Sequence, residues 1–485
     1  MATKVYSGRQ KVVMPISKEE FEADILGNLK EYLGYAVKTH NSNVREIKKL
    51  HKVYLGDQDI YSDKTRYNGS EINNYVVENH TKKVIDFKVG FMYGKPLDYS
   101  IAKAMETDDI TYLNSYLKDC NKASLDIEKA QDLYEFGVSY QLILPKTSQE
   151  INDIEKEAPF KISRLPLENT CVVWSNDIPS QQLFGMVIGT QREENAIKNI
   201  YNIYLPNRKI LLNWKFEEIR SDVQSYDFIP VVEYTINNCR MGLVELVLPL
   251  QNLINKIDSS QIDEIEENVN NWLVIKNQLI DEEWKKVYQE LKKERVISLM
   301  TNNPDTPPSV EIMTNEIKHE AVNLFVERIQ KALYDIASTP QASGNVTSGG
   351  DTGQARLLGN GWESSQNQAQ VDETYLLQYE MLLLKRLLSI CKPYPKCPIN
   401  QIGASDVNIK FNINMSNNLL VKTQSLQNLR AIHFPPKEAL TICGITNDVD
   451  GVGNAWESSI KEQQELSQVQ LAQKTQTKDT NTNDK

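Results

Sequence analysis

The chain has 485 residues, of which 40% are hydrophobic and 25% charged, and its formal net charge at pH 7 is −11. This length and composition are typical of a folded protein that divides into several packed regions. The acidic balance argues against a protein that holds nucleic acid tightly, because such proteins are normally basic on the binding face. Residues 1–14 lack an apolar core of signal-peptide length. The most apolar run, Leu243–Leu253, is interrupted by polar residues and is far too short to span a membrane.

Four helices are predicted within the first 137 residues. Between residues 17 and 51, apolar residues recur every three to four positions, starting with Phe21 and Ile25. A second helix is expected from Asn73 to Tyr93, where a glycine and then a proline end it. Residues 108–137 have the pattern of two more helices.

The sequence pattern changes at residue 138, and residues 138–235 are predicted to form strands. Short apolar runs are separated by turn-forming residues; they are VSYQLILP, KISRLPL, CVVWS, LFGMVIGT, IYNIYLP and IPVVEYT. Helices followed by a group of strands predict an α+β body.

Beyond Asn238 the chain is predicted to be mostly helical again. The expected helices cover 242–268, 316–337, 353–392 and 416–433, and the third is long against the usual three or four turns. A short mixed insert at 271–315 separates the first two. The polar tail beyond about residue 460 is expected to be disordered after a last helical stretch.

The segment 338–353 is dense in Gly, Ser, Thr and Asn. It cannot bury enough apolar surface to fix one conformation, so a mobile loop is expected. A loop of this length inside an ordered domain is usually functional or disordered. The strongly patterned helices on both sides favour a function.

Two ligand-binding patterns are incomplete. Gly90–Pro96 has three residues between its glycines and a proline after the lysine, whereas a phosphate loop needs four residues and then Ser or Thr. A helix C-cap is favoured there, and no nucleotide hydrolysis is expected. Residues 446–457 place Asp448, Asp450, Gly451 and Glu457 at four positions of a calcium loop, but the first position is Thr446. A plain surface turn is favoured over calcium binding.

No catalytic constellation is found, and neither a metal nor a cofactor is expected. The five histidines (40, 51, 80, 319 and 433) show no metal-binding spacing and are predicted to be solvated or hydrogen-bonded. No GxSxG nucleophile motif occurs. The six cysteines are scattered without a CxxC pair, which predicts reduced thiols in a cytoplasmic protein.

An acidic cluster lies in the second half of the helix predicted at 242–268. It consists of Asp258, Asp263, Glu264, Glu266 and Glu267. The favoured interpretation for a monomer is a solvent-exposed helix face. The alternative places the cluster around a ring, where repeated copies would make a strongly negative lumen.

Several stretches over most of the chain resemble elements of one known family. They are Tyr54–Ile60, Asn79–Pro96, Glu135–Gln141 (with Ser139 and Gln141 as departures), Ile229–Tyr234 followed by Asn237 and Asn238, Ser348–Ala355, and Asn360–Trp362. Their order and spacing together are specific. The chain resembles the portal proteins of tailed bacteriophages, of the type found in siphophages and in prophages of Gram-positive bacteria.

The resemblance implies an α+β, mainly helical portal fold that assembles as a ring, commonly of twelve subunits. The implied regions are a wing at 1–240, a first stem helix at 241–270, a clip at 271–315, a second stem helix at 316–338, a tunnel loop at 339–353, a long wing helix and return at 354–404, and a crown with a disordered tail at 405–485. Gly359 lies early in the long helix, where glycine costs about 1 kcal/mol relative to alanine. A kink or a delayed helix start is therefore expected.

The resemblance also implies a function. The ring would conduct double-stranded DNA without sequence specificity during packaging and ejection. Its implied partners are the terminase large subunit, head–tail connector or adaptor proteins, and the major capsid and scaffolding proteins. It would reside at the capsid vertex of the virion, and in the host cytoplasm during assembly, with no role for a membrane.

The implied DNA-facing residues lie in the tunnel loop, and they are Ser343, Gly344, Asn345, Val346, Thr347, Ser348, Gly349, Gly350 and Asp351. Such small polar side chains can touch a duplex without reading its sequence. The alternative function is a nucleic-acid-processing enzyme in which the loop at 339–353 gates an active site. That alternative needs convergent carboxylates or histidines, which the sequence does not display.

Overall fold

The computed structural model describes residues 8–60, 72–101, 107–147, 149–151, 153–193, 196–269, 272–276, 309–313, 319–341, 361–413, 419–432, 434–443, 445 and 451–461. The chain divides into two compact units. The first comprises the residues up to 341 together with 367–412, and the second comprises 342–366 and the residues from 413 onward.

The first unit begins with two helices, α1 (Lys18–Ala23) and α2 (Ile25–Leu55). Ser17 caps α1 in a reciprocal capping box with Glu20. Asp24 separates the helices, because its non-helical backbone ends α1 while its carboxylate accepts from the Gly27 N–H and caps α2. The single helix expected at 17–51 is thus two helices, and the second ends at Gly56, whose φ is +96°.

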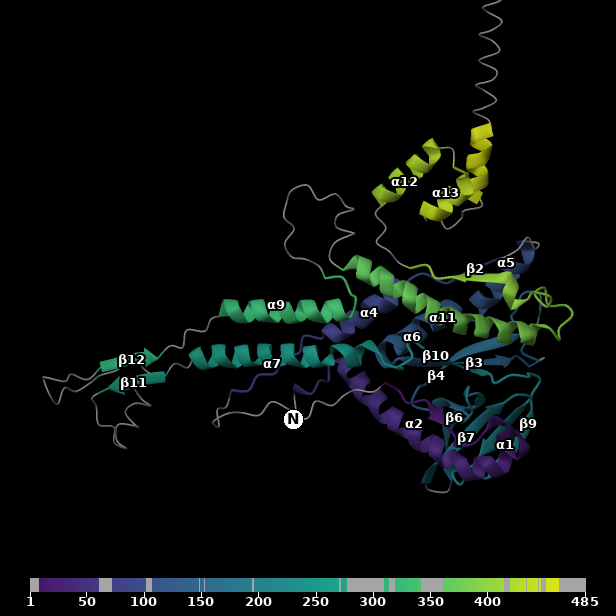
Figure 1. The fold of residues 1–485 in the computed structure, drawn as a ribbon, viewed down its shortest axis with the longest axis horizontal. Coiled ribbons are helices and arrows are strands. Elements are labelled where there is room, and N and C mark those ends of the chain that lie inside the picture. Colours follow the sequence, from purple (N-terminus) through teal and green to yellow (C-terminus); the bar gives the residue numbers. More distant parts are fainter. Residues whose placement is uncertain are drawn as a thin grey trace, which may run out of the picture. The chain divides into compact units, whose positions relative to one another are not determined.

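Helix α2 covers one face of a six-stranded sheet with the order β1-β5-β6-β7-β8-β9 (Figure 1). All neighbours are antiparallel except β1 and β5. The strands are β1 (Val12–Val13), β5 (Thr170–Trp174), β6 (Gln182–Glu193), β7 (Ala196–Leu205), β8 (Arg208–Leu212) and β9 (Glu218–Val223).

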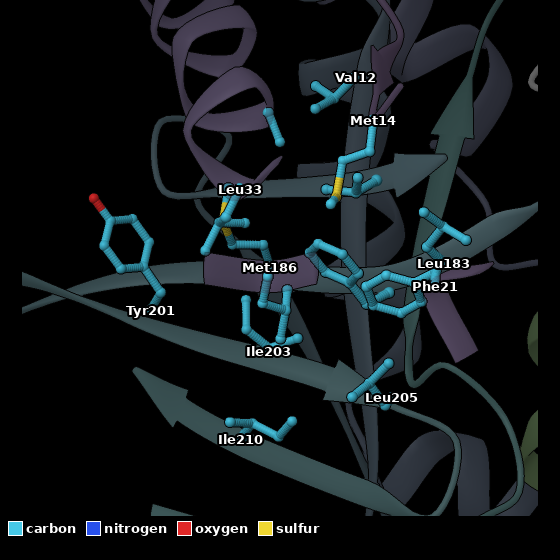
Figure 2. Packing of buried hydrophobic residues seen from close by; sticks show 14 of the residues in the cluster. Val12, Met14, Phe21, Leu33, Leu183, Met186, Tyr201, Ile203, Leu205 and Ile210 are labelled. Atoms are coloured by element: carbon cyan, nitrogen blue, oxygen red, sulfur yellow. The ribbon is translucent and has the colours of Figure 1, made fainter. Parts of the chain in front are cut away.

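The core between α2 and this sheet follows the strand period of two. Tyr201, Ile203 and Leu205 alternate along β7 and point to the same face, where Leu33 of α2 meets them (Figure 2). Strands β8 and β9 were not predicted from the sequence. In β9 (EIRSDV) polar residues outnumber apolar ones, and none of its side chains is buried, so it carries no apolar alternation.

A three-stranded antiparallel sheet, β10-β3-β4, forms the second layer of strands. Its strands β3 (Val138–Pro145), β4 (Phe160–Leu165) and β10 (Val231–Thr235) match three of the predicted runs. Helices α5 (Thr107–Asp119) and α6 (Lys122–Phe136) confirm the pair expected at 108–137, and α6 packs on β3 and β4. The short strands β2 (Asp98–Ile101) and β13 (Val407–Lys410) pair with each other, with the 3₁₀ turn Ala404–Asp406 just before β13.

The helix expected from Asn73 begins later in the structure. Helix α4 spans His80–Tyr93, with Asn79 as its N-cap and Gly94 as its C-cap. The C-cap at Gly94 confirms the interpretation of the Gly90–Pro96 run. The expectation for residues 73–79 was wrong, because these residues pair with side chains of another helix, as described below.

Three further long helices lie wholly or mostly in the first unit. Helices α7 (Leu243–Val269) and α9 (His319–Ile336) confirm the predictions at 242–268 and 316–337. Between them in the chain, β11 (Trp272–Lys276) and β12 (Ser309–Met313) pair as an antiparallel hairpin. Helix α11 spans Trp362–Cys391, so it starts later than the expected residue 353. Gly361, just before it, has a φ of +84°, which a continuing helix does not permit.

The second unit contains α12 (Leu419–Ala431), which confirms the helix predicted at 416–433, and α13 (Pro436–Cys443). Residues 451–461 are also helical. Gly451 and Glu457 of the partial calcium pattern lie in this helix, whereas residues 446–450 lie outside the described residues. The tail from residue 462 is outside them as well.

The described residues contain no helix long and apolar enough to cross a membrane. All six cysteines are free thiols, as predicted.

Candidate functional site

Helices α7 and α9 lie side by side and pack through their apolar stripes (Figure 1). Val247 and Ile254 of α7 meet Val326, Ile329 and Leu333 of α9 in one buried cluster. The spacing of these residues places them on one face of each helix. The two helices therefore form a stable pair that brackets the β11–β12 insert in the chain.

An extended segment, residues 72–79, runs along α7 and is held by a polar seam. We define the polar seam as Gln251, Asn255, Ser259 and Asp263, which are spaced four residues apart on α7. In order, the backbone N–H groups of His80, Glu78, Val76 and Asn74 donate to these four side chains over 3.0, 3.3, 2.9 and 2.6 Å. Four residues of helix rise about 6 Å, and two extended residues span about 6.6 Å. The four-residue spacing on α7 therefore stays in register with the two-residue spacing of the extended segment.

The polar seam explains why the helix predicted at 73–93 starts only at His80. Residues 73–79 can satisfy their alternate N–H groups without helical bonds, because Gln251, Asn255 and Ser259 are fully buried acceptors. The side chain of Gln251 also donates to the Glu78 carbonyl over 2.7 Å. The spacing of the seam residues was visible in the sequence, but the segment that they bind was not.

The acidic cluster on α7 is only partly a solvated face. Asp263 accepts from both nitrogens of Asn74, and Glu266 accepts from the Asn74 side chain over 2.7 Å. Asp258 is half-buried, and burial, followed by the charge of Glu78, raises its pKa. Glu264 is half-buried, and the side chain of Glu267 lies outside the described residues.

A cavity of about 160 Å³ lies where the end of α9 meets α4, α6, α11 and the start of α7. Lys88 lines it, is 2% exposed, and its ammonium has no hydrogen-bond partner in the described part of the chain. Burial lowers the pKa of Lys88 to about 8, although the charge of Asp372 opposes this. Asp372, also in the lining, accepts from Tyr134 and Gln368, both over 2.9 Å.

The sequence did not predict that the residues of this cavity come together. A signal existed for Lys88, because it falls four residues after Val84 and three after Ile85, on the apolar stripe of α4. No local signal marked Asp372. Residues Ile336–Ser338 line the cavity and directly precede the segment 339–353.

A second group of buried charges joins α6 to α11. Lys122 and Lys129 both donate to Asp126 of their own helix and to Glu380 of α11. All four side chains are at most 4% exposed. Two positive and two negative charges compensate each other there, as buried ions require.

The nine tunnel-loop residues predicted from the sequence, Ser343 to Asp351, lie outside the described residues. The histidines that the structure describes with their side chains are hydrogen-bonded as predicted: His40 to the Glu168 carbonyl, His51 to Glu135, and His80 to Tyr334. Among the described residues, no group of three or more His, Cys, Asp or Glu side chains could hold a metal ion.

The comparison with protein families gives a match over most of the chain. Residues 34–478 match the family described as phage portal protein, SPP1 Gp6-like. A search of curated proteins gives no match to this chain. The family match includes the helix pair α7 and α9, the insert between them and the long helix α11. The chain therefore belongs to the SPP1 Gp6-like family of phage portal proteins.

Proposed function

We propose that this protein is the subunit of a ring, commonly of twelve copies in portal proteins, that forms the DNA channel at one vertex of a tailed-phage capsid. The genome passes through the channel during packaging and ejection. The observation that carries the proposal is the family match over residues 34–478. We place the phage among siphophages or prophages of Gram-positive hosts on the resemblance of the sequence elements.

The assignment of regions follows the chain order. Helices α7 and α9 serve as the stem, the insert with the β11–β12 hairpin as the clip, and residues 339–353 as the tunnel loop. The wing comprises residues 1–240 and 354–404, and the crown begins at 405. The paired apolar faces of α7 and α9 support a stem built from both helices.

The proposed partners divide between the ends and the wall of the ring. The terminase large subunit docks on the clip during packaging and is replaced by head–tail connector proteins. The major capsid and scaffolding proteins surround the ring as it assembles in the host cytoplasm. In the channel, the tunnel loop touches DNA through small polar side chains, and the acidic residues of α7 contribute to a negative wall.

The net charge of the chain favours a channel through which DNA slides over a protein that holds DNA tightly. Twelve copies at −11 carry a formal charge of about −132. Repulsion between this charge and the phosphates reduces friction on a moving duplex, whereas phosphate-gripping lysines and arginines would hold it.

The ring is tested by mass photometry of the purified full-length protein. Twelve subunits of 55.5 kDa predict a species near 666 kDa, with a central hole in negative-stain images. A ring with a neighbouring subunit number agrees with the proposal. A strictly monomeric or dimeric protein with nuclease or ATPase activity contradicts it and favours the processing enzyme.

A further inference from the structure

A groove of about 610 Å³ opens beside the six-stranded sheet, between α1, the β7–β8 turn and α11. Phe21, Leu183 and Leu205 form part of its apolar lining, and Figure 2 shows these three side chains gathered at one end of the core. A volume of this size is typical of sites for small organic ligands. The groove lies entirely within the first unit.

Arg386 of α11 lines the groove and is 6% exposed. In the described part of the chain, its Nη1 has no hydrogen-bond partner, and its Nη2 donates to Gln182 Oε1 over 3.5 Å. The guanidinium carbon lies 5.8 Å from the centre of the Phe228 ring, within the range of a cation–π interaction. Among the described residues, no carboxylate oxygen lies within 4.0 Å of an Arg386 nitrogen, which is the limit for an ion pair. Burial lowers the pKa of Arg386 to about 10, although the charge of Tyr234 opposes this.

The other charges that line the groove already have counter-charges. Lys18 lies 3.8 Å from Glu22, and both of these side chains line the groove. Arg208 donates to Ser221 over 2.6 Å and lies 3.9 Å from Glu218. Among the residues that the structure describes, Arg386 is therefore left without a counter-charge.

The chemistry of a fitting ligand follows from these observations. A buried charge without a partner is unfavourable, and an anion that pairs with it relieves this cost. The planar guanidinium fork matches a carboxylate through two parallel hydrogen bonds. A single uncompensated charge favours a monoanion over the phosphate dianion, and the apolar lining favours an organic body on that anion.

We propose that this groove binds a small organic carboxylate, whose anionic group pairs with Arg386 and whose apolar body lies against Phe21, Leu183 and Leu205. This inference does not depend on the ring or on DNA. It assigns to the sheet-containing part of the protein a ligand site that is separate from the α7–α9 helix pair.

The test measures binding of 3-phenylpropionate to the purified full-length protein by isothermal titration calorimetry. We expect saturable binding of one ligand per chain. The neutral 3-phenylpropionamide and inorganic phosphate should bind at least roughly tenfold more weakly, because neither offers an apolar monoanion to Arg386.

Three variants assign the binding to Arg386. Arg386→Gln removes the charge and should weaken binding at least roughly tenfold. Arg192→Gln, at an exposed arginine of β6, is the matched control and should leave the affinity unchanged. Arg386→Lys keeps the charge without the fork and should bind with intermediate affinity, which preserves the test if Arg386→Gln fails to fold.

Three results would overturn the proposal. One is the absence of saturable binding to the wild-type protein. The second is an affinity that is the same for the acid and its amide. The third is an affinity that does not change in either Arg386 variant.

Discussion

Glu380 shows how a single buried residue can join two distant helices. It is fully buried in α11 and accepts hydrogen bonds from Lys122 and Lys129 of α6. Burial alone would raise the pKa of Glu380, but the two ammonium groups outweigh burial and lower this pKa to about 2. The carboxylate is therefore ionised in the folded protein over the whole physiological range.

Replacing this carboxylate should strongly destabilise the protein. In Glu380→Gln, two buried lysines share only Asp126, and an uncompensated buried charge typically costs about 3 to 5 kcal/mol. The free energy of unfolding, measured with urea at pH 7, should fall by this amount. The loss should shrink as the pH falls from about 4.5 towards 2, because a carboxylate with a lowered pKa contributes stability that acid removes.

The control for this prediction is Glu373→Gln on the same helix, at a half-buried position outside the charge group. Its effect should stay within about 0.5 kcal/mol. An equal effect of the two substitutions at pH 7 would contradict the role given to Glu380.

Lys88 has the opposite relation to stability, because its buried ammonium has no hydrogen-bond partner in the described part of the chain. The pKa of Lys88 is about 8 in the folded protein and 10.5 when exposed, so the unfolded chain binds more protons between these pH values. Lys88→Met should therefore be more stable than the wild type at pH 7, by up to about 3 kcal/mol. This advantage should decrease as the pH rises from 8 to 10.5.

Urea unfolding at several pH values between 7 and 10.5 measures this difference. Lys385→Met, at an exposed lysine of α11, provides the comparison and should show no such pH dependence. A constant difference between wild type and Lys88→Met across this range would show that the ammonium is not penalised by burial.

At the scale of elements, the helices before and after the segment 339–353, α9 and α11, are each held in place by contacts with other helices. Leu333 of α9 lies in the cluster shared with α7, and Glu380 of α11 binds α6. Deleting Gly344–Gly350 should therefore leave ring assembly intact. It should impair DNA packaging or retention, because the proposed contacts between the loop and DNA are lost.

Assembly is measured by mass photometry, and packaging by DNase-protected DNA in particles from a complemented phage. Deletion of Asp479–Lys485, seven residues beyond the family match, is the control and should leave packaging unchanged. Loss of the ring in the Gly344–Gly350 deletion would mean that the loop is structural.

The elements also show where prediction from sequence succeeds. Helices α7, α9 and α12 were predicted within a few residues, because the residue pattern that marks a helix is local. The start of α4 was misplaced, since the acceptors that hold residues 73–79 extended belong to α7, nearly 190 residues away. A helical pattern around Val76 and Val77 gave no warning of this competition.

At the scale of the whole molecule, the acidic net charge is consistent with the DNA channel proposed from the family match. An acidic chain is unsuited to gripping phosphates and well suited to a channel that must let DNA slide. The family match extends from residue 34 to residue 478 and covers most of both compact units. The proposed function therefore applies to the chain as a whole.

The sequence by itself determined the α+β character, most of the long helices, the acidic balance, the spacing of the seam residues on α7 and the resemblance to portal proteins. These properties depend on local periodicity and on the order of motifs along the chain. The tertiary structure decided which charges are buried and which of them are compensated. Glu380 meets Lys129 from 251 residues away, whereas Lys88 and Arg386 have no ion-pair partner among the described residues. Pairing depends on contacts between distant segments. The apolar stripe of α4 marks Lys88 as a candidate for burial, but no local pattern shows which buried charges find a partner.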